Sequence, residues 1–293
     1  MKIAVSGETL GKSHSLKEIT QYICEYGVKA IELWPENVPD GSGEIVHRLY
    51  KNRDISAAQS ILNKAGVEVA CVAFGGAFDS GIVENGLLYA TELARSVDVA
   101  ASLGAKFVNH YLYYISMEEK ANIEHLKKIY SKAIERAEAT GVTLVLENEA
   151  HDSTKNPEEM LRIVNAMESD YFKTNYDAVN YFQASYEGFP YAYDVLKDKI
   201  AYVHIKDGCR YVPEHGHKKD ALGGSMSGAN QGQSIFYPMM GSGILNINGL
   251  IQRIKGDGYQ GWYTLEPHTT TALWHTYIKA EIAYIKAIDA IDM

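Results

Sequence analysis

The strongest constraint on the fold is a regular alternation of short β-rich runs with stretches whose apolar residues recur at helical spacing. The expected strands begin near residues 2, 30, 67, 106, 142, 172, 200 and 262. The expected helices cover residues 16–26, 55–64, 87–103, 117–139, 157–167, 191–196, 247–255 and 273–288. Alternation of this kind predicts an α/β protein with a parallel sheet covered by helices, and eight units favour closure into a (β/α)8 TIM barrel.

The spacing of the units also predicts a single domain over residues 1–293. The last step, from the seventh to the eighth strand, is about twice as long as the others, and its excess lies in residues 208–243. This segment is rich in Gly, Ser, Asn and His. A long loop without secondary structure is uncommon in a compact domain and is often functional, so we expect a lid-like loop after the seventh strand.

Composition excludes several classes of protein. The chain has 28 Lys and Arg against 37 Asp and Glu, a net charge of −9, which argues against nucleic acid as a partner. It lacks the run of about eighteen apolar residues that a membrane span needs, and its apolar start is too short for a signal peptide. The three cysteines, Cys24, Cys71 and Cys209, form no C-x-x-C pair. We therefore expect a cytoplasmic protein without a disulfide framework.

Four candidate metal ligands stand at the ends of four successive predicted strands. They are Glu147, Asp177, His204 and Glu266. The carboxyl ends of barrel strands meet at one rim, where the active sites of such barrels lie. Carboxylates and imidazole together suit one divalent cation, namely Mn²⁺, Mg²⁺, Co²⁺ or Zn²⁺. Each acidic residue alone could instead cap the helix that follows its strand.

Five segments around these positions resemble the xylose isomerase-like barrels, a superfamily of sugar isomerases and epimerases, inosose dehydratases and apurinic endonucleases (AP endonuclease family 2). The segments are LVLEN at 144–148, NYDAVN at 175–180, VHIKD at 203–207, GYQGW at 258–262 and LEPH at 265–268. The glycine turn and strand at 27–33 also resemble the second strand of the family. The resemblance spans essentially the whole chain.

The resemblance implies that Glu147, Asp177, His204 and Glu266 bind one divalent metal and that the two glutamates are the catalytic acid–base pair. It implies a sugar isomerase or epimerase of carbohydrate metabolism that acts on a monosaccharide or a related keto or hydroxy compound. A metal would polarise the substrate carbonyl, while one glutamate removes the neighbouring proton and the other returns one. Barrels of this family are commonly dimers or tetramers, so we expect a homo-oligomer.

Two further positions follow from the same resemblance. Arg210 stands six residues after His204, where the epimerases place an arginine that contacts substrate; its alternative is a solvated loop cation. Asn180 stands where the epimerases have a substrate-contacting histidine. An asparagine can bind a hydroxyl group but cannot act as an acid or base, which weakens the specific assignment as a ketose 3-epimerase.

Four other side chains at strand ends are candidates for substrate binding, each with a structural alternative. Glu32 could contact a hydroxyl group or form an ion pair at the rim, and Trp34 could pack on the C–H face of a sugar or belong to the core. His110 could be a polar group of the pocket or a buried hydrogen-bonded residue. Lys206 could contact substrate, order the surroundings of the metal or form a salt bridge across the rim.

Two other reactions remain open at this point. An inosose-type dehydratase would use the same metal and enediolate chemistry but would eliminate water. An endonuclease of this superfamily uses three zinc ions and additional histidines. Here Phe74 and Asn180 stand where two of those histidines would be, so we expect one metal rather than three.

Overall fold

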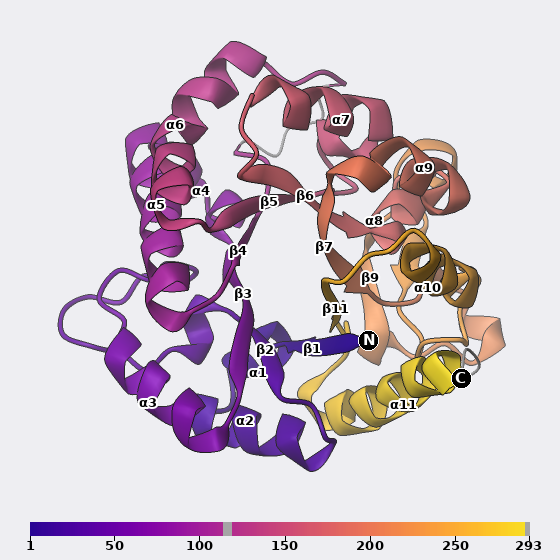
Figure 1. The fold of residues 1–293 in the computed structure, drawn as a ribbon. Helices are drawn as coiled ribbons and strands as arrows, with labels where there is room; N and C mark the ends of the chain where they lie inside the picture. The colour runs from indigo at the N-terminus through magenta and orange to yellow at the C-terminus, as the bar shows by residue number, and fades with distance from the viewer. Residues whose placement is uncertain (114–118, 291–293) are drawn as a thin grey trace.

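The computed structural model describes residues 1–113 and 119–290 and shows a closed barrel of parallel strands within a ring of helices (Figure 1). Around the barrel the strands follow the order β1-β11-β7-β6-β5-β4-β3-β2. Their bounds are β1 Lys2–Ser6, β2 Ala30–Leu33, β3 Glu68–Phe74, β4 Phe107–His110, β5 Thr143–Glu147, β6 Phe172–Asp177, β7 Ile200–Ile205 and β11 Trp262–Leu265. The predicted eight-stranded TIM barrel is confirmed.

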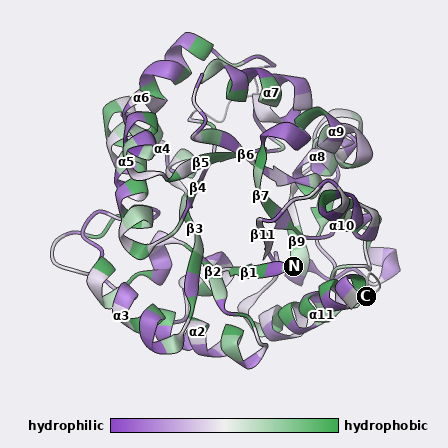
Figure 2. Cartoon of the chain, in the orientation of Figure 1, coloured by the Kyte–Doolittle hydropathy of each residue, from purple (hydrophilic) through white to green (hydrophobic). Residues whose placement is uncertain are grey.

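Helices that follow the strands cover the outside of the barrel. The longer ones are α2 Leu16–Glu25, α3 Ile55–Ala65, α5 Gly86–Leu103, α6 Ile123–Thr140, α7 Pro157–Ala166, α10 Ile247–Gly256 and α11 Thr271–Ala290. The helix predicted over 191–196 is reduced to α9, Tyr193–Leu196, after an irregular turn. Residues 117 and 118 of the helix predicted over 117–139 lie outside the described residues. Polar and apolar residues alternate around these helices (Figure 2).

Helix α6 shows why the ring packs on the barrel. Its buried residues recur every three or four positions and so form one stripe along the helix. They are Leu126, Ile129, Tyr130, Ala133 and Ala137. The side chain of Asn122 accepts the backbone N–H of His125 and caps the first turn, and Gly141 ends the helix in the left-handed conformation. At the start and end of the chain, the N-terminal ammonium group lies 2.9 Å from a carboxylate oxygen of Asp289, which joins β1 to α11.

The barrel interior is filled by side chains that alternate along the strands with outward-facing ones. A small cluster of buried residues that includes Val145 and Tyr202 occupies this space. Because side chains on a strand alternate between two faces, the residues two positions further on, Glu147 and His204, point to the same interior near the carboxyl ends of the strands.

Short helices and a small second sheet complete the C-terminal rim. Three helices were not predicted because they are too short to show a period: α1 Glu8–Gly11, α4 Ser80–Val83 and α8 Ala178–Gln183. The segment 208–243 is not the structureless loop that its composition predicts. It contains an antiparallel sheet of β8 Cys209–Arg210, β10 Ser234–Phe236 and β9 Leu222–Ser225. Its apolar residues, among them Ile235 and Tyr237, pack in a separate cluster with Val179 of α8 and Tyr277 of α11.

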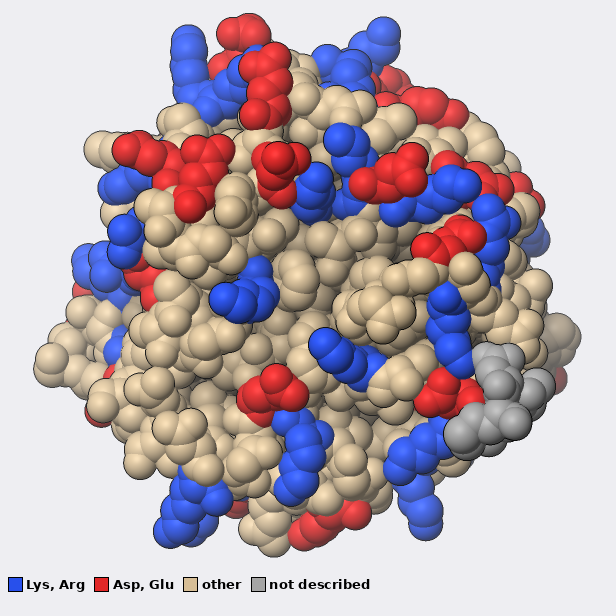
Figure 3. All heavy atoms as spheres, in the orientation of Figure 1, with Lys and Arg blue, Asp and Glu red and all other residues tan. Residues whose placement is uncertain are grey.

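The surface fits the acidic composition. On the face shown in Figure 3, Lys and Arg side chains are interspersed with Asp and Glu rather than gathered into a stripe. None of the helices within residues 1–113 and 119–290 is both long and apolar enough to cross a membrane.

Candidate metal centre and active site

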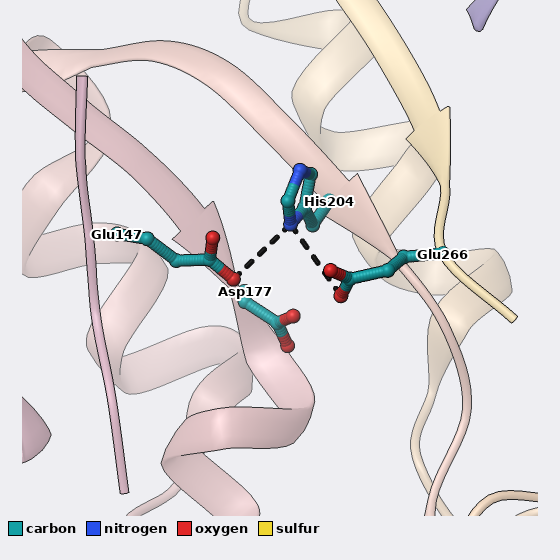
Figure 4. A group of neighbouring side chains, drawn as sticks. All are labelled: Glu147, Asp177, His204 and Glu266. Carbon is teal, nitrogen blue, oxygen red and sulfur yellow. Dashed lines mark hydrogen bonds and ion pairs between the residues drawn. The ribbon is translucent and has the colours of Figure 1, made fainter. Parts of the chain in front are cut away.

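Four buried side chains converge at the carboxyl ends of four adjacent strands (Figure 4). They are Glu147 at the end of β5, Asp177 at the end of β6, His204 near the end of β7 and Glu266 just after β11. Each offers one ligand atom, and these atoms all lie within 4.8 Å of one another. Carboxylate oxygens and an imidazole nitrogen at this spacing could hold a divalent metal ion.

Strand register brings these residues together. Asp177 of β6 lies opposite His204 of β7, and His204 lies opposite Thr264 of β11. Glu147 of β5 lies opposite Asn175, two residues before Asp177. Since the strands are parallel, the residues that end them share one rim of the barrel.

The imidazole of His204 is held between carboxylates on both sides. Its Nδ1 lies 3.1 Å from Oε1 of Glu147 and 3.5 Å from Oε2 of Glu266, while its Nε2 lies 2.8 Å from Oε2 of Glu32. Because Nε2 donates to Glu32, the other ring nitrogen, Nδ1, faces the cluster and is the one that could bind a metal. Burial alone would lower the pKa of His204, but in the metal-free chain Glu147, Glu32 and Glu266 raise this pKa well above its usual value.

Glu32 is itself fixed from two further directions. Its Oε1 lies 3.1 Å from Nε1 of Trp34, which donates to it, and 3.4 Å from Oγ of Ser6. Both Glu32 and Trp34 are almost fully buried. The structure therefore places them behind His204, where they orient the imidazole.

Asparagine side chains hold the carboxylate of Glu147. The Nδ2 atoms of Asn109 and Asn175 donate to its Oε2 at 2.7 and 3.2 Å, and Nδ2 of Asn180 lies 3.4 Å from its Oε1. Asn180 also donates to the backbone oxygen of Asn148 at 2.9 Å. The amides fix the position of this carboxylate without adding charge.

Asp177 has a structural role as well as a place in the cluster. Its Oδ1 accepts the backbone N–H groups of Val179 and Asn180 at 2.8 and 3.1 Å and so caps α8. Its Oδ2 lies 2.8 Å from Nζ of Lys206. Burial raises the pKa of Asp177, and the charge of Lys206 offsets only part of this increase. Asp177 can therefore cap α8 through Oδ1 and still offer Oδ2 to a metal, so the two predicted roles do not exclude each other.

Lys206 is buried among the acidic residues of the cluster. Its Nζ lies 2.5 Å from Oε2 of Glu266 and 3.2 Å from Nε2 of His268. Burial would lower the pKa of Lys206, but Asp177 and Glu266 raise it well above its usual value. Burial would raise the pKa of Glu266, but Lys206 and His204 hold it well below the usual range.

Three charged residues of the rim were missed by the sequence analysis. Glu8, at the start of α1, has a pKa raised by burial and by the charge of Glu266. Glu149 follows β5, and burial and the charge of Glu147 raise its pKa well above the usual value. Arg48, in the loop after β2, lies with Nη1 3.6 Å from Oε1 of Glu8. No motif marks Glu8 or Arg48, because they come from a very short helix and an irregular loop.

Asn109 and His268 were also missed, although the sequence held a signal for each. Asn109 precedes His110 on β4 and shares the inward face of the strand with Phe107, as the alternation of side chains requires. His268 lies two residues after Glu266 within the LEPH segment, and its Nε2 lies 3.3 Å from Oε2 of Glu266.

The structure does not bring two of the candidate residues to the cluster. His110 is fully buried on the outer side of β4, with its ring 5.2 Å from that of Tyr130 and 5.4 Å from that of Phe172. Burial lowers the pKa of His110 to about 4, so its imidazole is neutral. It belongs to the packing between barrel and helices rather than to a pocket. Arg210 is exposed on β8, at the edge of the small sheet.

The residues present fit a divalent cation. Glu147, Asp177, His204 and Glu266 offer hard oxygen and borderline nitrogen ligands, all buried. A carboxylate behind the ligating histidine is a common companion of metal sites, and Glu32 supplies it here. Fold and cluster together define a TIM barrel with a candidate metal centre at its C-terminal rim.

The sequence matches the protein family described as xylose isomerase-like TIM barrel over residues 21–288, so the chain belongs to this family. No curated protein matches it. Several solved structures share the fold. A xylose isomerase-like TIM barrel protein from Mycobacterium smegmatis in complex with magnesium has a TM-score of 0.72 and 17% identity over 98% of this chain and 96% of that chain.

Two further structures with a similar fold belong to proteins that are named as enzymes. The probable 3-DHS dehydratase AsbF of Bacillus anthracis has a TM-score of 0.69 and 14% identity, over 98% of this chain and 99% of that chain. The 3-keto-D-glucoside 4-epimerase YcjR of E. coli has a TM-score of 0.65 and 17% identity, over 99% of each chain. The fold is therefore shared with epimerases and dehydratases.

Proposed function

We propose that this protein is a divalent-metal-dependent isomerase or epimerase that acts on a monosaccharide or a related hydroxy-carbonyl compound. The observation that carries the proposal is the presence of two buried glutamates, Glu147 and Glu266, on opposite sides of one candidate metal site. In the barrel, β6 and β7 separate the strands that bear them. A substrate carbon between the two carboxylates would have one on each face.

The metal, when bound by Glu147, Asp177, His204 and Glu266, supplies a Lewis acid that polarises a carbonyl group. The chain's own residues move the proton. One glutamate removes a proton from the carbon beside the carbonyl, and the other glutamate returns a proton to the opposite face or to the neighbouring carbon. Asn109, which donates to Glu147, holds that carboxylate in place.

Lys206 supports the second glutamate in this proposal. Its ammonium group contacts both Glu266 and Asp177, and its charge holds the pKa of Glu266 well below the usual range. An ionised Glu266 can bind metal, and the ammonium group beside it can supply the proton that is returned to the substrate. Asn180 and Trp34 are positioned to orient neighbouring groups, Glu147 and Glu32, rather than to transfer protons.

The test is proton exchange in D₂O. Protein loaded with Mg²⁺ or Co²⁺ is incubated with a panel of ketoses, aldoses, hydroxypyruvate and inososes, and deuterium uptake is followed by proton NMR. We expect deuterium at the carbon beside the carbonyl, and a loss of uptake of about a thousandfold in Glu147→Gln. The control variant, Glu119→Gln, changes a carboxylate that is 74% exposed and should keep full uptake.

Two outcomes would contradict the proposal. Conversion without deuterium uptake would indicate a hydride shift between adjacent carbons. Uptake that survives in both Glu147→Gln and Glu266→Gln would show that these glutamates are not the acid–base pair.

A dehydratase is the second candidate, because Glu266 has a proton donor, the ammonium group of Lys206, beside it. Nζ of Lys206 lies 2.5 Å from Oε2 of Glu266. Such a group could protonate a leaving hydroxyl as well as a carbon. The same NMR experiment separates the two reactions, because elimination gives an unsaturated product with new vinylic signals, whereas epimerisation conserves the atoms of the substrate.

A further inference from the structure

Tyr111 follows β4 directly, and the proposed proton transfer does not use it. Because side chains alternate along a strand, Tyr111 points to the same side as Asn109, towards the barrel interior, while His110 between them lies on the outer side. In the pairing of β4 with β5, His110 lies opposite Leu146. One residue further along each strand, Tyr111 therefore stands beside Glu147, whose carboxylate Asn109 holds.

The ring of Tyr111 is held by aromatic neighbours. Its centroid lies 4.4 Å from that of Phe78 and 6.5 Å from that of Trp34, and each pair of rings meets at an angle. The backbone oxygen of Tyr111 accepts from the hydroxyl group of Tyr89 at 2.9 Å. Only 3% of Tyr111 is exposed. The side chain is therefore held in place before a substrate binds.

The hydroxyl group of Tyr111 is the part of this side chain that has no partner. Among the residues that the structure describes, none forms a hydrogen bond with it. The hydroxyl groups of nearby tyrosines are used: that of Tyr113 donates to the backbone oxygen of Val83, and that of Tyr130 accepts from the backbone N–H group of Tyr113. A buried tyrosine usually finds a hydrogen-bond partner for its hydroxyl group. The unused hydroxyl group of Tyr111 thus marks a place where a ligand can accept a hydrogen bond.

The surroundings of this hydroxyl group show where it points. Burial raises the pKa of Tyr111 well above its usual value, and the charges of Glu147 and Glu266 raise it further. Both glutamates belong to the cluster of Figure 4, so the hydroxyl group lies towards that cluster and not towards the outer helices. This agrees with the inward direction that the alternation along β4 requires. A phenol in these surroundings keeps its proton and is a hydrogen-bond donor.

The other donors beside the two glutamates are already engaged. The amide of Asn109 is used by Glu147, and the ammonium group of Lys206 is used by two carboxylates of the cluster. Lys206 follows β7, whereas Tyr111 follows β4 and stands beside Glu147. Removal of a proton from a carbon beside a carbonyl group leaves negative charge on substrate oxygen, and a donor that faces this charge accelerates the step. Tyr111 is placed to be that donor on the side of Glu147.

We propose that Tyr111 is a further catalytic residue, whose hydroxyl group donates a hydrogen bond to the substrate oxygen nearest the carbon from which Glu147 removes a proton. The phenol keeps its own proton, and its role is to stabilise the negative charge that develops on this oxygen. The inference rests on the proposed function, because it assigns a role in that reaction. Contact between the hydroxyl group and a ligand can nevertheless be measured without any reaction.

The test compares two buried tyrosines whose hydroxyl groups both find no partner in the described part of the chain. The control is Tyr263 on β11, which is 1% exposed and packs against the ring of Tyr259. Alternation places it on the face of β11 opposite to that of Glu266. Tyr111→Phe and Tyr263→Phe each remove one oxygen atom and keep the ring.

Deuterium uptake from D₂O is measured for both variants over a range of substrate concentrations. We expect Tyr111→Phe to lower kcat and kcat/KM by about the same factor, about 10- to 100-fold, because the hydrogen bond strengthens only as charge develops on the oxygen. Tyr263→Phe should leave both constants unchanged.

Contact with the ligand is followed by a second measurement. Tyr111 is replaced by 3-fluorotyrosine, and its ¹⁹F signal is recorded while ketoses, aldoses, pentitols and hexitols are added to Mg²⁺-loaded protein. We expect the signal to shift on addition of at least one of these compounds, and the same label at Tyr263 to stay unchanged. This label keeps the hydroxyl group, so it decides the question if Tyr111→Phe does not fold by circular dichroism.

The outcomes separate this inference from the proposed function. A fall in kcat of less than threefold in Tyr111→Phe, with uptake intact in the original protein, would overturn the role of Tyr111 and leave the proposed reaction standing. Absence of uptake from every substrate would refute the proposed reaction, and the ¹⁹F signal would then decide on Tyr111. A shift would support contact with a ligand, whereas no shift at 50 mM of any compound would overturn it.

Discussion

Replacing Glu32 with glutamine should weaken the affinity of the cluster for a divalent metal without removing a ligand. Glu32 is fully buried, and its Oε2 accepts from Nε2 of His204 at 2.8 Å. The glutamine side chain would keep the shape of the glutamate and an acceptor for that N–H group, but it would lose the charge. A divalent cation carries twice the charge of the proton that it displaces from Nδ1, so the carboxylate favours the metal over the proton.

The size of the effect follows from this one contact. A hydrogen bond to a charged acceptor contributes about 1.5–3 kcal/mol, against about 0.5–1.5 kcal/mol for a neutral one. The difference of about 1–2 kcal/mol corresponds to a loss of roughly five- to thirtyfold in affinity. This agrees with the loss of roughly 10- to 100-fold that follows removal of groups hydrogen-bonded to metal ligands.

The measurement is competition for Mn²⁺ or Zn²⁺ against a chromophoric chelator at constant pH. Glu92→Gln is the control, because Glu92 is also a buried glutamate, 2% exposed, but pairs with Arg95 on helix α5 away from the site. A change of less than threefold in Glu32→Gln, in folded protein, would refute the role of Glu32 in orienting His204. A loss of equal size in Glu92→Gln would point to general destabilisation instead.

Three further predictions concern stability. Burial raises the pKa of Asp152 to about 7, so the stabilisation by the protonated carboxyl group is present below pH 4 and is lost as the pH rises through 7. Above pH 7, Asp152→Asn should therefore be more stable than the original protein by about 2–4 kcal/mol in urea unfolding. Stabilities of the two proteins that change in parallel with pH would contradict this prediction. Ser15→Ala removes the side chain that caps α2 by accepting the N–H group of Glu18, and should lower the free energy of unfolding by about 1 kcal/mol in the same assay. The control Ser131→Ala, at an exposed helical position, should lower it far less. Adding Mn²⁺ at about 100 times its dissociation constant should stabilise the fold by about 2.7 kcal/mol, reversed by EDTA; a melting temperature unaffected by metal would argue against the centre.

The barrel could be predicted because each strand and helix carries its own period. The burial stripe of α6 and the inward alternation of β5 are both visible in the sequence. The short helices of the rim could not be predicted, because α1 and α4 have four residues each and a single turn shows no period. The small sheet in 208–243 was missed for a similar reason. Its strands have two to four residues, and two of them contain glycine or serine.

The metal ligands could be placed from the sequence because they end regular strands, whereas Glu8 and Arg48 could not. Alternation along β4 puts Asn109 and His110 on opposite faces, and applying it would have removed His110 from the candidate residues. Arg48 reaches the rim only through the path of the loop between β2 and α3, which no local pattern specifies. The sequence therefore predicts the metal centre better than the irregular segments of the rim around it.

The two glutamates of the site have unlike surroundings, and this difference favours different roles for them. Glu147 is held by the uncharged amides of Asn109 and Asn175, so taking up a proton would disturb hydrogen bonds but break no ion pair with a lysine or arginine. Glu266 is held by Lys206, and protonating it would break an ion pair of 2.5 Å. Pairs of carboxylates with such unequal surroundings divide acid and base work between them. The unequal contacts favour Glu147 as the group that takes the proton from carbon, with Glu266 and Lys206 on the face where a proton is returned.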